Sequence, residues 1–449
     1  MIETQKYKGK KVLVMGLARS GMAAARILKE LEAEVIINDG RPYEGNEDAL
    51  VMESEGFEVI TGHHNIDILD RGIELIVKNP GIPYKTNPLL IEAAKRNIPI
   101  VVEVEIAYAI SEAPFIGITA TNGKTTTTTL IHEIMQESDI PSRLAGNIGF
   151  VSSLVAKEAK ENEVLVTELS SFQLMGIEDF RPKIGLILNI TEAHLDYHTD
   201  ILEYRQAKLN LVKKQLDSDI FVYNADDEFI VSQLWQTKGQ TVPFSMIKVV
   251  DGAYLSNNKI YFREEFIIDT DEVLLKGDHN MQDVLGAVAV CKLYGATTSA
   301  IVAVLKRFSG VKHRLQFVKE VKGVKYYNNS KATNVIATQT ALRAFNQPII
   351  LIAGGLDRDH DLTPLAEDFK DVKAIYAFGQ SKLRFETLAE EHNIPCYVFE
   401  TMEESFENAE KIAEDGDIVL LAPACASWDQ YVDFEERGDA FISLVERLK

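Results

Sequence analysis

The chain has 449 residues, of which 46% are hydrophobic, and its formal net charge at pH 7 is -21. Because a single hydrophobic core stops growing at roughly 250 to 300 residues, this length predicts two or three domains. The negative charge argues against nucleic-acid binding, and no apolar run reaches the roughly 18 to 20 residues that cross a bilayer.

The start of the chain, MIETQKYKGKK, lacks the apolar stretch of a signal peptide. The three cysteines are far apart and have neither CxxC spacing nor the pattern of a disulfide framework. We therefore expect a cytoplasmic protein in a reducing compartment, without membrane insertion.

Strand-like apolar runs alternate with helical patterns along the chain, which predicts α/β domains with parallel sheets. The first block contains the strand KKVLVMG (residues 10–16), a helix over 23–32 and the strand EVIIND (34–39). Its turn GLARSG resembles a dinucleotide-binding fingerprint, with Asp39 about twenty residues further on. Ala18 replaces the second glycine of that fingerprint, which weakens a nicotinamide reading.

The second block opens with the strand PFIGIT (114–119), followed by ATNGK and five threonines (125–129). A loop between a strand and a helix start can cradle phosphates, with Lys124 on the β and γ phosphates and Thr125 on Mg²⁺. Ile118 stands where the usual pattern has its first glycine, so a plain Gly-Lys turn is an alternative. Because threonine is a poor helix former, the threonine run favours hydroxyls beside phosphate and metal.

Two further strands of this block lead to polar residues: VLVTE ends at Glu168, and IGLILN ends at Asn189, in the segment that continues to His194. Parallel strands bring their carboxyl ends to one edge, so both residues should converge on the phosphate loop and could hold a divalent metal. Each residue alone also fits a solvated strand end or a capping position. The third block has the strands PIILIAGG, AIYAFG and DIVLLAPA (417–424) and is expected to start with VKYYNN (324–329).

An ordered series of motifs resembles that of the Mur ligases over essentially the whole chain. It is most similar to the members that add D-glutamate. The motifs are TNGKTTT, GNIG, ELSSFQL, NITEAHLDYH, YRQAKLNL, NADD, GDHN, HRLQ, NNSKATN and APACASWDQY.

The resemblance implies an α/β chain of three domains. These are a Rossmann-like N-terminal domain that binds the UDP-substrate (residues 1–112), a central P-loop ATPase-like domain (113–311) and a Rossmann-like C-terminal domain that binds the amino acid (312–449). It also implies an ATP-dependent ligase that joins D-glutamate to UDP-N-acetylmuramoyl-L-alanine through an acyl phosphate, during peptidoglycan precursor synthesis. Two Mg²⁺ ions and a monomeric state are expected.

Roles at the reaction centre follow from the same resemblance. Lys208 would be carbamylated, which turns a cation into an anion facing metal ions; without the resemblance it would be an ordinary exposed helix lysine. The chain departs from the family at Ala120, usually glycine, and at Asn329, often aspartate. The implied catalytic residues are Lys124, His194 and Lys208. The implied metal ligands are Thr125, Glu168, His194 and Lys208. The implied ATP-binding residues are Thr121, Asn122, Gly123, Lys124, Thr125, Thr126, Asn280, Arg314 and Asn329.

Two further groups would bind the substrates. A plain loop remains an alternative for residues 79–81, and packing remains one for Trp428 and Phe434. The implied UDP-substrate contacts are Ala18, Arg19, Ser20, Asp39, Arg41, Asn79, Gly81 and Asn147. The implied D-glutamate contacts are Lys331, Thr333, Arg358, Ser427, Trp428 and Phe434.

Three other functions compete with this one. A sibling ligase would add another amino acid or act on folate. A nicotinamide-dependent oxidoreductase would use GLARSG and Asp39. A nucleotide switch would bind ATP without substrate-dependent phosphate release.

Overall fold

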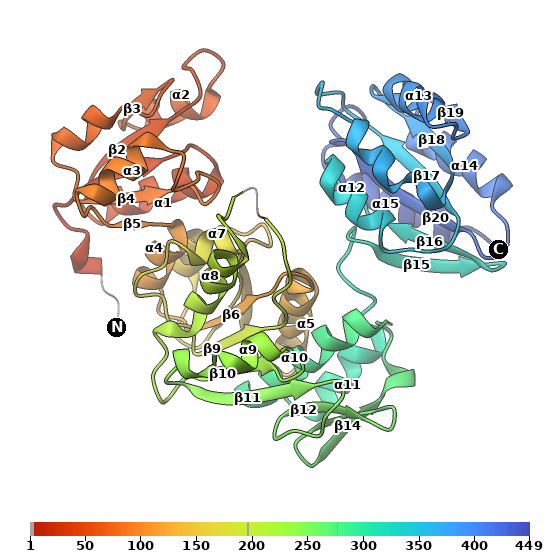
Figure 1. Ribbon diagram of the computed structural model, residues 1–449, viewed down its shortest axis with the longest axis horizontal. Coiled ribbons are helices and arrows are strands. Elements are labelled where there is room, and N and C mark those ends of the chain that lie inside the picture. The colour runs from red at the N-terminus through yellow and green to blue at the C-terminus, as the bar shows by residue number, and fades with distance from the viewer. Residues whose placement is uncertain (1–3, 195–196, 276) are drawn as a thin grey trace. The chain divides into compact units, whose positions relative to one another are not determined.

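The computed structural model describes residues 4–194, 197–275 and 277–449 (Figure 1). Residues 195 and 196 of the NITEAHLDYH motif lie outside the described residues, as do the side chains at 278 and 279 of GDHN. The chain forms two compact units, residues 1–308 and 309–449. Within the described part of the chain, no helix is both long and apolar enough for a transmembrane span.

The first sheet has five parallel strands in the order β3-β2-β1-β4-β5. Gly16 follows β1 with a φ of +93°, and a Cβ on Gly21 would lie 1.9 Å from the Gly16 carbonyl oxygen. Both glycines of GLARSG are therefore required by the close packing of the chain on itself. The strands are β1 (Lys11–Met15), β2 (Glu34–Asp39), β3 (Glu58–Thr61), β4 (Leu75–Lys78) and β5 (Ile100–Val101), and the helices are η1 (Thr4–Lys6), α1 (Arg19–Glu30), α2 (Glu47–Ser54), η2 (Ile66–Arg71), α3 (Pro88–Lys95) and α4 (Glu103–Ile110).

The second sheet, in the same unit, has nine strands in the order β14-β13-β12-β11-β10-β9-β6-β8-β7. Its strands are β6 (Phe115–Thr119), β7 (Ser142–Gly146), β8 (Val164–Glu168), β9 (Ile184–Ile187), β10 (Ile220–Asn224), β11 (Gln240–Ser245), β12 (Ala253–Ser256), β13 (Lys259–Phe262) and β14 (Glu265–Asp269). Its helices are α5 (Lys124–Glu137), α6 (Ser152–Glu158), α7 (Ser171–Leu174), α8 (Ile201–Lys213), α9 (Glu228–Ser232), η3 (Leu234–Gln236), η4 (Thr270–Glu272), α10 (Asp278–Tyr294) and α11 (Thr298–Arg307).

Strands β12 to β14 depart from the expected parallel sheet, because β13 runs antiparallel to both neighbours. Asn257 and Asn258 form the turn between β12 and β13 with φ values of 51° and 57°. Asparagine tolerates this left-handed conformation, which matches the twist of a two-residue hairpin. The hairpin therefore extends the sheet without a crossover helix.

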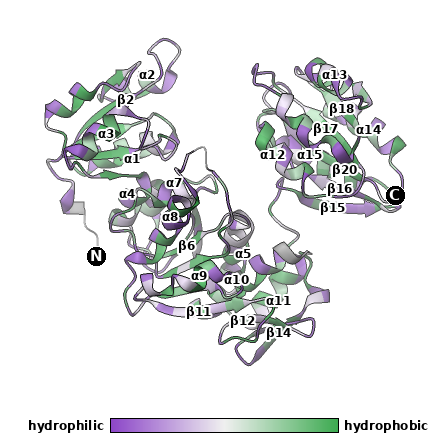
Figure 2. Cartoon of the chain, viewed as in Figure 1, coloured by the Kyte–Doolittle hydropathy of each residue, from purple (hydrophilic) through white to green (hydrophobic). Residues whose placement is uncertain are grey.

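The third sheet, in the unit of residues 309–449, has six strands in the order β15-β16-β20-β17-β18-β19. Alternate residues of β17 enter two different cores, one covered by α12 and α13 and the other by α14 and α15. Its central strands stand out as hydrophobic in Figure 2. The strands are β15 (Gln316–Val321), β16 (Val324–Asn328), β17 (Ile349–Gly354), β18 (Val372–Phe378), β19 (Cys396–Val398) and β20 (Ile418–Ala424), and the helices are α12 (Val335–Leu342), η5 (Thr363–Asp371), α13 (Lys382–Glu391), α14 (Met402–Ile412) and α15 (Phe434–Glu446).

Strand β15 precedes VKYYNN, where the sequence predicted that the third block starts. It pairs antiparallel with β16. The connecting turn uses Lys322 and Gly323, both with positive φ. The short hairpin was missed because β15 is only partly buried and has no continuous apolar run.

Candidate active site

The phosphate loop occupies residues 120–123, between β6 and α5. Gly123 has a φ of +84°, and a Cβ there would lie 1.9 Å from Oδ1 of Asp283 on α10. The loop can therefore approach α10 only with glycine at this position. Asp283 is buried, and its place against the loop was not foreseen from the sequence.

Asn189, just beyond β9, holds the loop by its side-chain amide. Its Oδ1 accepts hydrogen bonds from the N–H groups of Thr121 (3.2 Å) and Asn122 (3.0 Å). Its Nδ2 donates to the Asn122 carbonyl at 3.1 Å. The hydroxyls of Thr121 and Tyr204 share a further hydrogen bond of 2.9 Å. Sequence reasoning gave Asn189 and Tyr204 no role; their only signal was their place in the motifs NITEAHLDYH and YRQAKLNL.

Not every threonine of residues 125–129 directs its hydroxyl to the phosphate loop. Thr129 donates its hydroxyl to the Thr125 carbonyl at 2.8 Å, one helical turn back. Thr127 and Thr128 are fully buried in the described structure. The expectation that the whole run faces phosphate and metal is therefore wrong for Thr129, whose hydroxyl is used inside the helix.

Two lysine side chains converge on the Ala120 carbonyl. Lys124 Nζ donates to it at 2.9 Å and to the Thr121 carbonyl at 2.9 Å. Lys208 Nζ, from α8, donates to the same Ala120 oxygen at 2.7 Å. The Ala120 side chain is buried in the hydrophobic core, so its extra methyl group points away from this polar contact.

Lys208 is 1% exposed, so the reading of an exposed helix lysine is wrong. Burial and the nearby charge of Lys124 hold the pKa of Lys208 well below its usual range, while Glu168 opposes the shift. A lysine with a lowered pKa is more often neutral. Neutral amine is the form of lysine that reacts with carbon dioxide.

Glu168 ends β8 and is 1% exposed. Its Oε1 accepts a hydrogen bond from Asn147 Nδ2 at 2.8 Å. Its Oε2 is buried and has no hydrogen-bond partner among the described residues. A buried carboxylate oxygen is costly unless it is paired or binds a metal, so this oxygen fits a divalent cation.

The described residues contain no group of three or more His, Cys, Asp and Glu side chains that could hold a metal ion by themselves. A cation beside Glu168 would therefore need other oxygen donors, such as the Thr125 hydroxyl, phosphate oxygens or a carbamate on Lys208. Such oxygen donors are those that Mg²⁺ prefers.

His194 lies in the segment that follows β9. Its ring centroid is 5.1 Å from that of Phe172 and 6.2 Å from that of Tyr204. The residue is exposed and has a φ of 56°. Histidine is one of the non-glycine residues that adopt this left-handed backbone more readily than most.

Two cavities lie beside the first sheet, and both are lined by Ala18, Arg19 and Asn79. The first, of about 410 Å³, extends to the central sheet. The second, of about 690 Å³, extends along the ends of β1 and β2. All the UDP-substrate residues inferred from the sequence line one cavity or the other: the first adds Ser20, Gly81 and Asn147, and the second adds Asp39 and Arg41.

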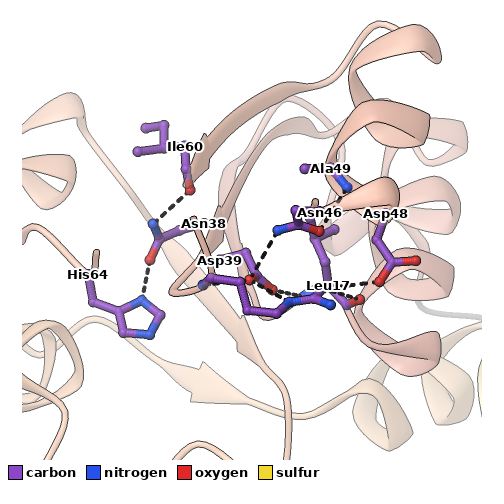
Figure 3. A network of polar contacts seen from close by, with 9 residues as sticks. Leu17, Asn38, Asp39, Asn46, Asp48, Ala49, Ile60 and His64 are labelled. Carbon is purple, nitrogen blue, oxygen red and sulfur yellow. Dashed lines mark hydrogen bonds and ion pairs between the residues drawn. The ribbon is translucent and has the colours of Figure 1, made fainter. Parts of the chain in front are cut away.

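Asp39 organises the second cavity (Figure 3). Its Oδ2 accepts from the Leu17 N–H at 2.6 Å, and its Oδ1 accepts from Arg41 N–H at 2.9 Å and Nε at 3.0 Å. Burial opposes ionisation, but these hydrogen bonds hold the pKa of Asp39 below its usual range. Both carboxylate oxygens thus have partners within the protein, so Asp39 shapes the turn around the cavity.

The C-terminal unit holds two cation–aromatic pairs. Lys331 Nζ lies 5.6 Å from the ring centroid of Phe434, and the Arg358 guanidinium lies 4.6 Å from that of Trp428. Trp428 is 63% exposed, so the alternative interpretation, in which Trp428 is a packing residue, is wrong. Thr333 follows Lys331 in one turn, and Ser427 is buried beside Trp428.

The predicted nucleotide contacts outside the loop lie in different surroundings. Asn280 is the third residue of α10 in one unit, and Arg314 precedes β15 in the other. Asn329 is buried, and its Oδ1 accepts a hydrogen bond from the Leu315 N–H at 2.9 Å. Asn329 therefore fixes the backbone next to Arg314. His313 is also buried there against Asn328.

Three family descriptions match the chain in order. They are "Mur ligase MurD-like, N-terminal domain" over residues 10–102, "Mur ligase middle domain" over 118–291 and "Mur ligase, glutamate ligase domain" over 313–425. Relatives named UDP-N-acetylmuramoylalanine--D-glutamate ligase, from Bacillus mycoides and Bacillus anthracis, are 50% identical over 444 residues, 98% of this chain and 98% of theirs. The chain belongs to the Mur ligase family. This membership overturns the oxidoreductase alternative.

Solved structures of other Mur ligases share the fold. MurF from Acinetobacter baumannii has a TM-score of 0.53 and 15% identity, covering 100% of this chain and 93% of that chain. UDP-N-acetylmuramate-alanine ligase MurC from Thermotoga maritima has a TM-score of 0.52 and 17% identity, covering 97% and 99%. These structures support the three-domain α/β architecture of this Mur ligase.

Proposed function

We propose that this Mur ligase joins D-glutamate to UDP-N-acetylmuramoyl-L-alanine, converting ATP to ADP and phosphate in the cytoplasmic synthesis of peptidoglycan precursors. The observation that carries the proposal is the convergence of Lys124, Lys208 and Glu168 on a phosphate loop. The 50% identity to ligases of that name supports the choice of substrates. We also propose a monomer with domain boundaries at 112/113 and 311/312.

In the first step the substrate carboxylate attacks the γ-phosphorus of ATP, the bond to ADP breaks and an acyl phosphate forms. Negative charge gathers on the transferring group, and stabilising it is the main task of the protein. Lys124 would exchange its two loop carbonyls for phosphate oxygens. The N–H groups of residues 123–126 would bind the remaining oxygens at the start of α5, while those of Thr121 and Asn122 stay on Asn189.

The residues that would hold two Mg²⁺ ions are Thr125, Glu168, His194 and carbamylated Lys208. The orphaned Oε2 of Glu168 fits this role. When bound, Mg²⁺ supplies positive charge that neutralises the negative charge of the phosphate oxygens.

In the second step the amine of D-glutamate attacks the acyl carbon, phosphate leaves and the amine loses a proton. The two carboxylates of D-glutamate need local cations, because the protein as a whole is strongly negative. Lys331 and Arg358 are the proposed cations, with Thr333, Ser427, Trp428 and Phe434 around them. The UDP portion would occupy the two cavities beside the first sheet.

Release of phosphate from ATP, measured with UDP-N-acetylmuramoyl-L-alanine, tests this function. We expect release to require the nucleotide substrate and to rise strongly with D-glutamate, but not with L-alanine, diaminopimelate or folate substrates. Lys124→Ala should lower the rate by about a hundredfold or more, because it removes a charge aimed at the phosphates. Equal release with another amino acid would support a sibling ligase, and ATP binding without release would support a nucleotide switch.

A further inference from the structure

Lys78 is a buried lysine at the end of β4 that has no part in the chemistry above. It is 1% exposed. Its Nζ donates to the carbonyls of Ile82 (2.9 Å), Pro80 (3.1 Å) and Asn79 (3.3 Å). One ammonium group therefore gathers three carbonyls of the turn that follows its own strand.

A fourth contact reaches the central domain. Lys78 Nζ also lies 3.2 Å from the Tyr197 hydroxyl oxygen, so its three N–H groups are shared among four acceptors, and this hydroxyl donates to the Pro80 carbonyl at 2.9 Å. Tyr197 lies in the segment after β9, three residues beyond His194. Lys78 and Tyr197 thus close a hydrogen-bonded ring with the turn, and its members come from two domains of one compact unit.

The surroundings of Lys78 are unusual for a cation. Among the described residues it forms no ion pair, and its Nζ lies 4.3 Å from the ring centroid of Tyr84. Burial lowers the pKa of Lys78 to about 7. A buried cation balanced only by carbonyl dipoles and rings is costly, and an apolar side chain would fill the same space at lower cost. Packing alone is therefore a poor explanation for a lysine here.

The ring of hydrogen bonds formed by Lys78, Tyr197 and the turn lies between the two proposed substrate cavities. Asn79 lines both cavities, Pro80 and Gly81 line the first, and Ile82 lines the second. On the side of the central domain, the centroid of the Tyr197 aromatic ring is 4.1 Å from that of Phe172, which also lines the first cavity. The contact between Lys78 and Tyr197 therefore joins a wall from the N-terminal domain to a wall from the central domain.

We propose that Lys78 and Tyr197 are positioning residues that hold the turn of residues 79–82 against the central domain. In this role they keep the diphosphate and sugar part of the nucleotide substrate in register with the phosphate loop. The identity of that substrate rests on the proposed function. Neither residue needs to touch the reacting atoms.

The test compares Lys78→Met, Tyr197→Phe and the double variant, with Lys95→Met as control because Lys95 is an exposed lysine of the same domain. Each single substitution should raise the KM for UDP-N-acetylmuramoyl-L-alanine by about 10-fold or more, the effect of losing a charge-assisted hydrogen bond. The KM for ATP should change by less than about 2-fold. The KM of the double variant should be close to that of the more impaired single variant, because both substitutions break the same ring of hydrogen bonds. The control should match the wild type.

Calorimetric binding of UDP-N-acetylmuramoyl-L-alanine is measured in parallel and does not depend on turnover. If the wild type binds this nucleotide but releases no phosphate, the proposed function fails, while the affinities of the variants still test the positioning role. Unchanged affinity in Tyr197→Phe, which loses only one oxygen, would overturn the proposal. So would multiplicative effects in the double variant, or equal losses for ATP and the nucleotide substrate.

Discussion

At the scale of single residues, the burial of Lys208 has the greatest consequence. Its ammonium is desolvated and faces Lys124, both of which disfavour the charged form. As a carbamate it would instead be an anion that can approach Lys124 and a metal ion. The same helix position that looked bland in the sequence is therefore central to the electrostatics of the site.

We predict that Lys208→Ala is nearly inactive and is partly rescued by short carboxylic acids such as acetate, which can occupy the vacated anionic position. Phosphate release with increasing acetate measures the rescue. Lys213→Ala is the matched control, because Lys213 lies on the same helix and has no proposed role. Lack of any response to acetate in Lys208→Ala, together with an unmodified lysine mass in the wild type, would remove the carbamate.

Glu103, at the start of α4, allows a prediction about pH. It accepts a hydrogen bond from the Ser153 N–H, but burial raises the pKa of Glu103 to about 7. A raised acid pKa means that the folded state holds a proton that the unfolded state releases between about pH 4.5 and 7. The stability that Glu103 contributes is therefore present below about pH 4.5 and is lost as the pH rises through 7.

Glu103→Gln keeps an oxygen acceptor and removes this ionisation. It should unfold at a higher Tm than the wild type at pH 8, by an amount that corresponds to about 2 to 3 kcal/mol. The difference should shrink towards pH 5, where Glu103 is protonated in the folded protein. Thermal unfolding at both pH values decides it, and a difference that is the same at pH 5 and pH 8 would contradict the assignment.

At the scale of elements, the phosphate loop is built by three neighbours: Asn189 beyond β9, Tyr204 on α8 and Asp283 on α10. They fix the loop before any ligand binds, which limits the reorganisation that ATP binding requires. Gly123 is the point where loop and α10 come closest.

Gly123→Ala should therefore raise the KM for ATP by about 10-fold or more, because its Cβ would collide with Asp283 and its φ of +84° is strained for alanine. Gly295→Ala is the control, since Gly295 also has a positive φ, of +105°, but no atom lies within 4 Å of its Cβ. The control should lower the Tm and leave the KM for ATP unchanged. If both variants bind ATP equally well, the contact with Asp283 does not shape the loop.

Much of the element order could be predicted from the sequence. Buried parallel strands are continuous apolar runs, so β6, β8, β17 and β20 were recognisable, and the residues after them were placed at the correct strand ends. The hairpins at β12–β13 and β15–β16 were missed, because their strands are short and partly exposed and their turns depend on positive φ at Asn257, Asn258 and Lys322.

The site was predictable only in part. Motif spacing named Lys124 and Glu168, but the burial of Lys208 was missed because a charged residue was read as exposed. Its spacing from Tyr204, Leu211 and Val212, which are buried on the same helix, was the local signal. Asn189 and Asp283 were missed for a different reason. Both act through contacts to a loop more than sixty residues away in sequence, and such pairings arise from the sheet order and helix packing.

At the scale of the whole molecule, the proposed roles are divided among the domains. The nucleotide substrate is assigned mainly to the first domain, with Asn147 from the second. ATP is assigned mainly to the second domain, with Arg314 and Asn329 from the third, and D-glutamate is assigned to the third. This division predicts that a substitution among the residues assigned to one substrate changes mainly the KM for that substrate.

Arg358→Ala should raise the KM for D-glutamate by about 10- to 100-fold, the effect of losing one charge-assisted hydrogen bond, and should leave the KM for ATP nearly unchanged. Arg343→Ala is the control, because Arg343 is an exposed arginine of the same unit, and its ion pair is with Asp368. Steady-state kinetics with each substrate varied in turn measures these KM values for Arg358→Ala and for the control. A loss of affinity for ATP as large as that for D-glutamate would assign Arg358 to the nucleotide or the fold.

The central claim is that the substrate carboxylate is phosphorylated by the ATP that the phosphate loop binds. Transfer of ¹⁸O tests it most directly, using UDP-N-acetylmuramoyl-L-alanine labelled in both carboxylate oxygens, with ATP and D-glutamate. The account predicts that each released phosphate carries one ¹⁸O atom and that the new amide keeps the other, as measured by mass spectrometry. Phosphate without label, released at the same rate as amide formation, would contradict it.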